Sequence, residues 1–254
     1  MRGVGSSVNS FILLTGEAIP GDVLRFYSHG NYDVLGTASV TSVSLQSTPL
    51  EITVNYLPQE VQDVVDNAYW TNQMRVGSDF NVLNTHTTGN RGRGANIKAS
   101  DGLIANNLFF EGVAYGDLDL GPEFSSWSEA DYVHNLTIIN NTVRDCNYPS
   151  KAAAAVMLHG DGDNPMDGNT NITINGLTIA NTTASNLYIG ASEAVSLDDV
   201  WESWPGAVAT FENVSFKGAM GNRCIEGKIG KQGIMIATLE GTVNGLGESA
   251  VAMC

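Results

Sequence analysis

A β-rich run that ends in asparagine recurs along the chain, and this repeat restricts the fold more than any other feature. The copies lie at 80–84, 102–110, 135–143, 172–183 and 207–216. Their closing asparagines are 23, 34, 40 and 32 residues apart, namely Asn84, Asn107, Asn141, Asn181 and Asn213. Imperfect repetition at a few tens of residues is typical of solenoids, in which one short unit stacks on the next.

A second short strand is expected after each asparagine. These strands are expected at 95–99, 115–120, 154–159, 186–191 and 224–229. Equivalent strands stacked in parallel, about 4.8 Å apart, make a parallel β-helix. Asparagine suits its corners because this residue tolerates the left-handed backbone conformation, and because its amide can bond to the copies above and below. The longer gaps predict inserted loops at one corner.

A β-sandwich is the competing all-β fold. The chain contains 28 glycines and 24 asparagines, which supply the turns that either architecture needs. A sandwich, however, predicts no fixed order of strand, asparagine corner and second strand. The repeat therefore favours the solenoid, with coils over 71–254.

Residues 1–70 lie outside the repeat and form a separate β-rich segment in this interpretation. Alternating apolar residues predict antiparallel strands at 21–28 and 40–56, and 58–70 is expected to be a short helix. A solenoid needs its exposed end covered. We therefore expect this segment to be an N-terminal cap or a small subdomain.

Charge and motifs exclude several classes of function. The formal net charge is −15, and the largest basic cluster is the pair at 91–93, so neither nucleic acid nor an anionic membrane is expected as a partner. The apolar run at 11–14 is too short for a signal peptide. Three cysteines leave at least one unpaired, and no zinc, nucleotide or serine-hydrolase motif occurs. No cofactor and no metal site are expected, and the oligomeric state stays open.

Residues 81–143 resemble a family of carbohydrate enzymes. The segment contains N-R-x-R-G at 90–94 and S-D-G-x-I-x-N-N-x-F at 100–109. W-x-E follows at 127–129, ahead of V-x-N-x-T-I-x-N-N-T at 133–142. Together they are most similar to glycoside hydrolase family 110, the α-1,3-galactosidases. Members are longer than this chain, which predicts a shortened or divergent relative.

The resemblance implies a right-handed parallel β-helix and cleavage of terminal α-galactosides, with an oligo- or polysaccharide as partner. It also implies an extracellular, secreted protein. Glycosylation is consistent with five N-x-S/T sequons, at Asn135, Asn140, Asn171, Asn181 and Asn213. Asparagine-rich strands also generate such triplets by chance, so the sequons alone do not decide localisation.

Glycoside hydrolysis needs two carboxyl groups, one protonated and one ionised. The densest acidic region also contains Asp131, and its candidate catalytic residues are Asp119, Glu129, Asp117 and Glu123. Asp117 and Asp119 share one face of a strand, which faces outward if Leu118 and Leu120 point into the core. Trp127 lies beside the glutamates, as the aromatic platform of a sugar site would. The alternative is a solvated acidic edge without a catalytic role.

Several other side chains are candidates for substrate binding. They are Arg91, Arg93, Lys98, His159 and Asp161. The arginines could instead pair with Asp101 or Glu111 to join adjacent coils. Lys98 precedes Asp119 by one coil, so stacking would place a cation near that carboxylate. His159 lies at a strand end, and the alternative to substrate binding there is a structural role. Asp161 lies in an Asp/Gly-rich turn that fits a calcium loop poorly.

Two further functions compete with the glycosidase hypothesis. A polysaccharide lyase on this scaffold would use calcium and a basic residue, and the acidity of the chain weighs against it. A non-catalytic glycan-binding or structural solenoid, which would be a truncated enzyme, accounts for the short N-terminal segment. Glycan identity, linkage, and inverting or retaining chemistry are not predicted.

Overall fold

The computed structural model describes most of the chain in fifteen segments. They are residues 3–7, 10–13, 18–30, 32–44, 50–64, 68–90, 92–110, 116–124, 131–146, 154–160, 168–181, 185–198, 201–202, 208–216 and 236–244. The chain divides into two compact units. The N-terminal unit is Met1–Val76 with Glu123–Asp131 and Asp161–Asp163, and the coil unit is Gly77–Pro122, Tyr132–Gly160 and Asn164–Cys254.

The N-terminal unit is built on one antiparallel sheet with the strand order β1-β2-β5-β4-β3-β6. Its strands are β1 (Gly3–Ser7), β2 (Ser10–Leu13), β3 (Val23–Tyr27), β4 (Val34–Ser44), β5 (Leu50–Val54) and β6 (Tyr69–Asn72). Alternating apolar residues of these strands pack with Val61 and Trp70 in one core. The antiparallel strands expected from the alternation at 21–28 and 40–56 are present.

The helix predicted over 58–70 is shorter than expected. Only one turn forms, α1 (Gln59–Gln62), and its buried residue is Val61. Trp70 lies instead in β6, opposite Phe26 of β3. The prediction is wrong at Tyr69 and Trp70, because these residues favour a strand and pair with the outer edge of β3. The predicted domain boundary at residue 70 stays a prediction.

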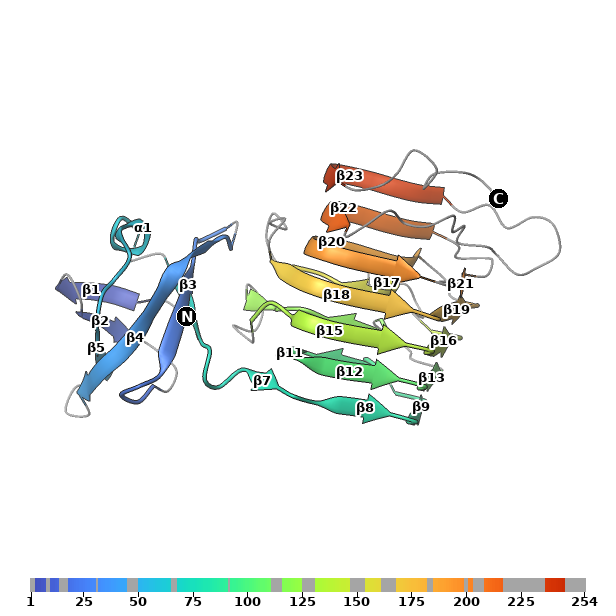
Figure 1. The fold of residues 1–254 in the computed structure, drawn as a ribbon, viewed down its shortest axis with the longest axis horizontal. Coiled ribbons are helices and arrows are strands. Elements are labelled where there is room, and N and C mark those ends of the chain that lie inside the picture. The colour runs from blue at the N-terminus through green and yellow to red at the C-terminus, as the bar shows by residue number, and fades with distance from the viewer. Residues whose placement is uncertain are drawn as a thin grey trace. The chain divides into compact units, whose positions relative to one another are not determined.

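The coil unit consists of short strands, each paired in parallel with its equivalent in the next coil (Figure 1). The first coil contains β7 (Gly77–Ser78), β8 (Asn81–Leu83), β9 (His86–Thr88) and β10 (Ala95–Ile97). The second contains β11 (Ala99–Ser100), β12 (Gly102–Ala105), β13 (Leu108–Phe110) and β14 (Leu118–Leu120). Next come β15 (His134–Ile139), β16 (Thr142–Arg144) and β17 (Ala154–Leu158), then β18 (Asn169–Asn175) and β19 (Thr178–Ala180). The last strands are β20 (Ser185–Asp198), β21 (Trp201–Glu202), β22 (Val208–Phe216) and β23 (Ile236–Asn244).

The all-β prediction and the stacking of parallel strands are both confirmed. The second strands expected at 95–99, 115–120, 154–159 and 186–191 correspond to β10, β14, β17 and β20. The one expected at 224–229 lies outside the described residues. Side chains that point inward form a continuous apolar core, such as Ile104, Ile138 and Ile174 in successive coils. Within the described residues, no helix is long and apolar enough to cross a membrane.

Left-handed residues recur at three corners of the coils. The register aligns Asp79, Asp101, Asn135 and Asn171 at one corner, Asn84, Asn106, Asn140 and Gly176 at the second, and Gly89, Asp145 and Asn181 at the third. All have φ between 51° and 67°. Asparagine and aspartate are the non-glycine residues that adopt this conformation most readily, which explains their abundance here.

A buried asparagine ladder follows the second corner. Asn141 Oδ1 accepts hydrogen bonds from the backbone N–H and from Nδ2 of Asn107, at 3.1 and 3.0 Å. Asn107 Oδ1 in turn accepts from the backbone N–H of Thr85 at 2.8 Å.

Asn135, at the first corner, combines the two roles expected of a corner asparagine, because it has a φ of 53° and its amide bonds to the coils on both sides. At the second corner these roles are divided between neighbours. Asn106 and Asn140 take the left-handed backbone, whereas Asn107 and Asn141 join the coils.

Candidate functional site

Asp119 is a buried acid on a strand face that points away from the core. Its neighbours Leu118 and Leu120 are fully buried in the core, as the alternation of β14 predicts. Asp119 therefore projects from the opposite face, yet its side chain is only 1% exposed. A solvated acidic edge is excluded for this residue, because other side chains cover the carboxylate.

Two cationic side chains from flanking coils cover Asp119. Arg93, just before β10, donates its Nε–H to Oδ2. His159, directly after β17, places Nε2 at 2.8 Å from Oδ1. Strands β10 and β17 are the two hydrogen-bonded neighbours of β14, so stacking brings the three residues together. We call Arg93, Asp119 and His159 the carboxylate cluster.

The hydrogen bonds of His159 fix its protonation state in this arrangement. Its Nδ1 lies 2.8 Å from the carbonyl oxygen of Gly160, which can only accept a hydrogen bond. Its Nε2 faces the carboxylate of Asp119, which is an acceptor when ionised. Both ring nitrogens must therefore carry a proton when Asp119 is ionised. In this form His159 is a second cation beside the carboxylate of Asp119.

Asp119 is the ionised member of this cluster. Burial alone would raise the pKa of Asp119, but the hydrogen bond and charge of His159 and those of Arg93 outweigh it and hold the pKa below the usual 3.8. The carboxylate is therefore charged at neutral pH. An acid in this state can supply negative charge or accept a proton, but it does not start a reaction as a proton donor.

Asp117, two residues earlier, has a different environment. It is fully buried beside the close backbone of Gly94 and the thiol of Cys146. Burial, followed by the charge of Asp117, raises the pKa of the Cys146 thiol far above its usual value. Cys146 forms no disulfide and remains protonated at neutral pH, so nucleophilic thiol chemistry is not expected there.

The other predicted site residues are distributed differently from the sequence hypothesis. Lys98 is half-buried, and the strand register places Asn96 rather than Lys98 beside Asp119. Arg93 supplies the cation instead. Glu123 is half-buried and belongs to the N-terminal unit. Four predicted residues lie outside the described part of the chain: Glu129, Trp127, Arg91 and Asp161.

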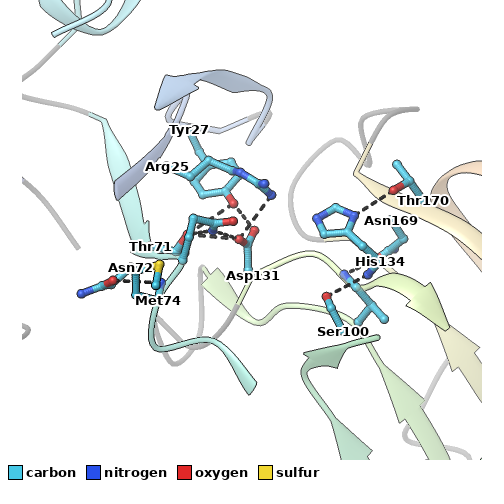
Figure 2. Close-up of polar contacts among 12 residues, drawn as sticks. Arg25, Tyr27, Thr71, Asn72, Met74, Ser100, Asp131, His134, Asn169 and Thr170 are labelled. Carbon is cyan, nitrogen blue, oxygen red and sulfur yellow. Dashed lines mark hydrogen bonds and ion pairs between the residues drawn. The ribbon is translucent and has the colours of Figure 1, made fainter. Parts of the chain in front are cut away.

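Another buried carboxylate, Asp131, lies in the N-terminal unit (Figure 2). Tyr27 donates its hydroxyl hydrogen to Oδ1. Oδ2 accepts hydrogen bonds from Arg25 Nη1 and Thr71 Oγ1, each at 3.3 Å, and from Gln73 Nε2. Burial, and then the charge of Asp131, raise the pKa of Tyr27 well above 10. Both oxygens are engaged, so Asp131 stabilises this unit.

The sequence hypothesis missed this group of side chains. Tyr27 and Asp131 are 104 residues apart, and neither belongs to a motif that points to the other. A further polar group, in the coil unit, was also missed: the backbone N–H of His134 donates to Ser100 Oγ at 3.0 Å, and His134 Nδ1 lies 2.9 Å from Thr170 Oγ1 (Figure 2). Both groups join segments that only the fold makes adjacent.

Comparison with known proteins gives one distant relation. No family model matches the chain. A segment of 103 residues is 31% identical to alpha-1,3-galactosidase A of Shewanella woodyi. This segment is 40% of the chain but only 16% of that protein. The chain therefore spans a small part of its relative.

Proposed function

We propose that the chain is a carbohydrate-active protein with a right-handed parallel β-helix, and that it hydrolyses terminal α-galactosides. The observation that carries this proposal is the carboxylate cluster on the outer face of β10, β14 and β17. The distant similarity to an alpha-1,3-galactosidase supports the same substrate class. The proposal includes an oligo- or polysaccharide as ligand and an extracellular location.

Asp119 acts in this proposal as the ionised carboxylate of the catalytic pair. Its lowered pKa suits the member that activates water or stabilises positive charge on the sugar ring. Arg93 and His159 are 25% and 20% exposed, so both side chains reach the surface beside Asp119, where a sugar ring could contact them.

Hydrolysis of an aryl α-galactoside and of an α-1,3-linked galactose disaccharide by the purified chain tests the proposal. Asp119→Asn should lower kcat by at least about 100-fold, since a general base contributes about that much, while sugar binding persists. Asp101→Asn is the matched control, because asparagine already occupies the equivalent corner at 135 and 171. A wild type that neither hydrolyses nor binds these sugars would sink the proposal.

A non-catalytic glycan-binding protein is the second candidate. Asp119 is 1% exposed, and both of its oxygens contact a cation, as in an ion pair that only stabilises a fold. This function is favoured over hydrolysis if the wild type binds galactosides without hydrolysing them and if Asp119→Asn binds the same sugars.

A further inference from the structure

The outer face that carries Asp119 continues over two more coils to an aromatic ring. The strand register aligns Asp119 with Met157 of β17 and then with Tyr188 of β20. Leu187 and Ile189 on either side of Tyr188 are fully buried in the core. Tyr188 therefore points outward like Asp119, and it is half-buried.

Gly190 determines how the ring of Tyr188 lies. A Cβ atom added to Gly190 would meet Tyr188 at 2.6 Å from its hydroxyl oxygen and at 2.9 Å from both Cε1 and Cζ. The ring is therefore folded along the strand, over the backbone of a residue that has no side chain. A side chain at position 190 would lift the ring away from the sheet.

This orientation brings the ring toward the carboxylate cluster. Leu158 pairs with Ile189, so the next residue on each strand, His159 and Gly190, occupy neighbouring positions in adjacent coils. Adjacent strands are about 4.8 Å apart. The ring over Gly190 is thus one strand spacing from His159. Met157, which lies between Asp119 and Tyr188 in the stack, is 9% exposed.

We propose that Tyr188, folded over Gly190, is the aromatic platform for a second pyranose ring. This inference rests on the proposed function and names its substrate more closely, as a galactoside with at least two sugar units. The apolar C–H face of a pyranose packs on an aromatic face, and the ring alone provides this contact. One sugar lies over the carboxylate cluster and its neighbour lies over Tyr188.

Three variants test the platform by calorimetric titration with an α-1,3-linked galactose disaccharide and with methyl α-galactoside. Tyr188→Ala should weaken disaccharide binding by about tenfold, the loss expected for one aromatic contact. Binding of the monosaccharide should change less than twofold. Tyr188→Phe keeps the ring and should bind like wild type. Gly190→Ala keeps the ring but displaces it, so it should resemble Tyr188→Ala.

The contrast between the two sugars separates a platform from a structural role, because a general loss of fold would weaken both. Equal disaccharide affinity in wild type and Tyr188→Ala would overturn the platform, even if aryl α-galactosides are hydrolysed. Selective loss of disaccharide binding without any hydrolysis would support the platform and defeat the hydrolase proposal. A wild type that binds neither sugar would overturn both.

Discussion

His159 Nε2 lies 2.8 Å from Asp119 Oδ1, and this contact joins two neighbouring strands on the outer face of the coil unit. Arg93 completes the arrangement from the strand on the other side. The cluster is therefore a link between three coils as well as a candidate site. Its two roles predict different responses to pH and to substitution.

Asp119 should make the free energy of unfolding depend on pH. Its pKa in the folded chain is below 3.8, whereas an unfolded aspartate has a pKa of about 3.9. The ionised pair therefore stabilises the fold above the unfolded pKa, and this contribution disappears as pH falls through the lower folded pKa. Asp119→Asn should cost about 1–3 kcal/mol at neutral pH, and much less at acidic pH.

Urea unfolding of wild type and Asp119→Asn at a series of pH values measures this effect. The difference between the two proteins should shrink steadily on the acid side of about pH 4. Asp101→Asn serves again as the control and should run parallel to wild type. A constant difference between wild type and Asp119→Asn over the whole series would contradict the assigned ionisation state.

The repeat in the sequence was sufficient to predict the strands within its runs, because corner residues and inward apolar side chains are local features, but β7, β9, β21 and β23 lie outside those runs. It did not predict which asparagine of a pair would be buried. Asn140 and Asn141 are chemically identical, and only the path of the coil decides that the first turns the backbone while the second contacts Asn107.

The sequence also did not predict which side chains enclose the carboxylate of Asp119. Its partners Arg93 and His159 are 26 and 40 residues away and lie just outside their strands, so the strand pattern gives them no fixed position. The sequence indicated Asp119, Arg93 and His159 separately. Their convergence depends on the stacking register, and a shift of one residue would have turned Asp119 into the core.

Substitution of Asn141 in the asparagine ladder should lower the free energy of unfolding strongly. Besides its two bonds from Asn107, this side chain donates to the carbonyl oxygens of Ile104 and Ile139 at 2.8 and 3.0 Å. Asn141→Ala removes all four of these hydrogen bonds, including the acceptor of the buried backbone N–H of Asn107, at about 1 kcal/mol each. We expect a loss of at least about 3 kcal/mol in the free energy of unfolding.

Asn140→Gly is the neighbouring control for that measurement. Position 140 is exposed with a φ of 51°, and glycine already occupies the equivalent corner at Gly176 with a φ of 67°. Chemical denaturation should show a change within about 0.5 kcal/mol. Comparable losses in the two variants would show that the corner, rather than the ladder, holds the coils together.

Tyr27→Phe tests the buried group around Asp131. The substitution keeps the ring, whose centroid lies 5.0 Å from that of Phe124, and removes only the hydroxyl that donates to Asp131. A lost hydrogen bond to a buried charge should destabilise the N-terminal unit by about 1–3 kcal/mol. Hydrogen exchange of the β3 and β6 amides measures this unit directly. Tyr56→Phe, at a side chain that is 59% exposed, should leave the same amides unchanged.

Gly121 lies where the backbones of two coils approach closely, beside the carboxylate cluster. Its φ is 120°, and a Cβ atom there would lie 2.0 Å from the carbonyl oxygen of His159. The obstacle is backbone, which cannot rotate away as a side chain can. Gly121→Ala should therefore force β14 and β17 apart and cost more than about 2 kcal/mol, from the left-handed strain and the overpacking together. Gly92→Ala meets no atom within 4 Å and should be nearly neutral. Thermal unfolding compares the two variants, and equal midpoints would mean that the coils can separate at His159 without loss of stability.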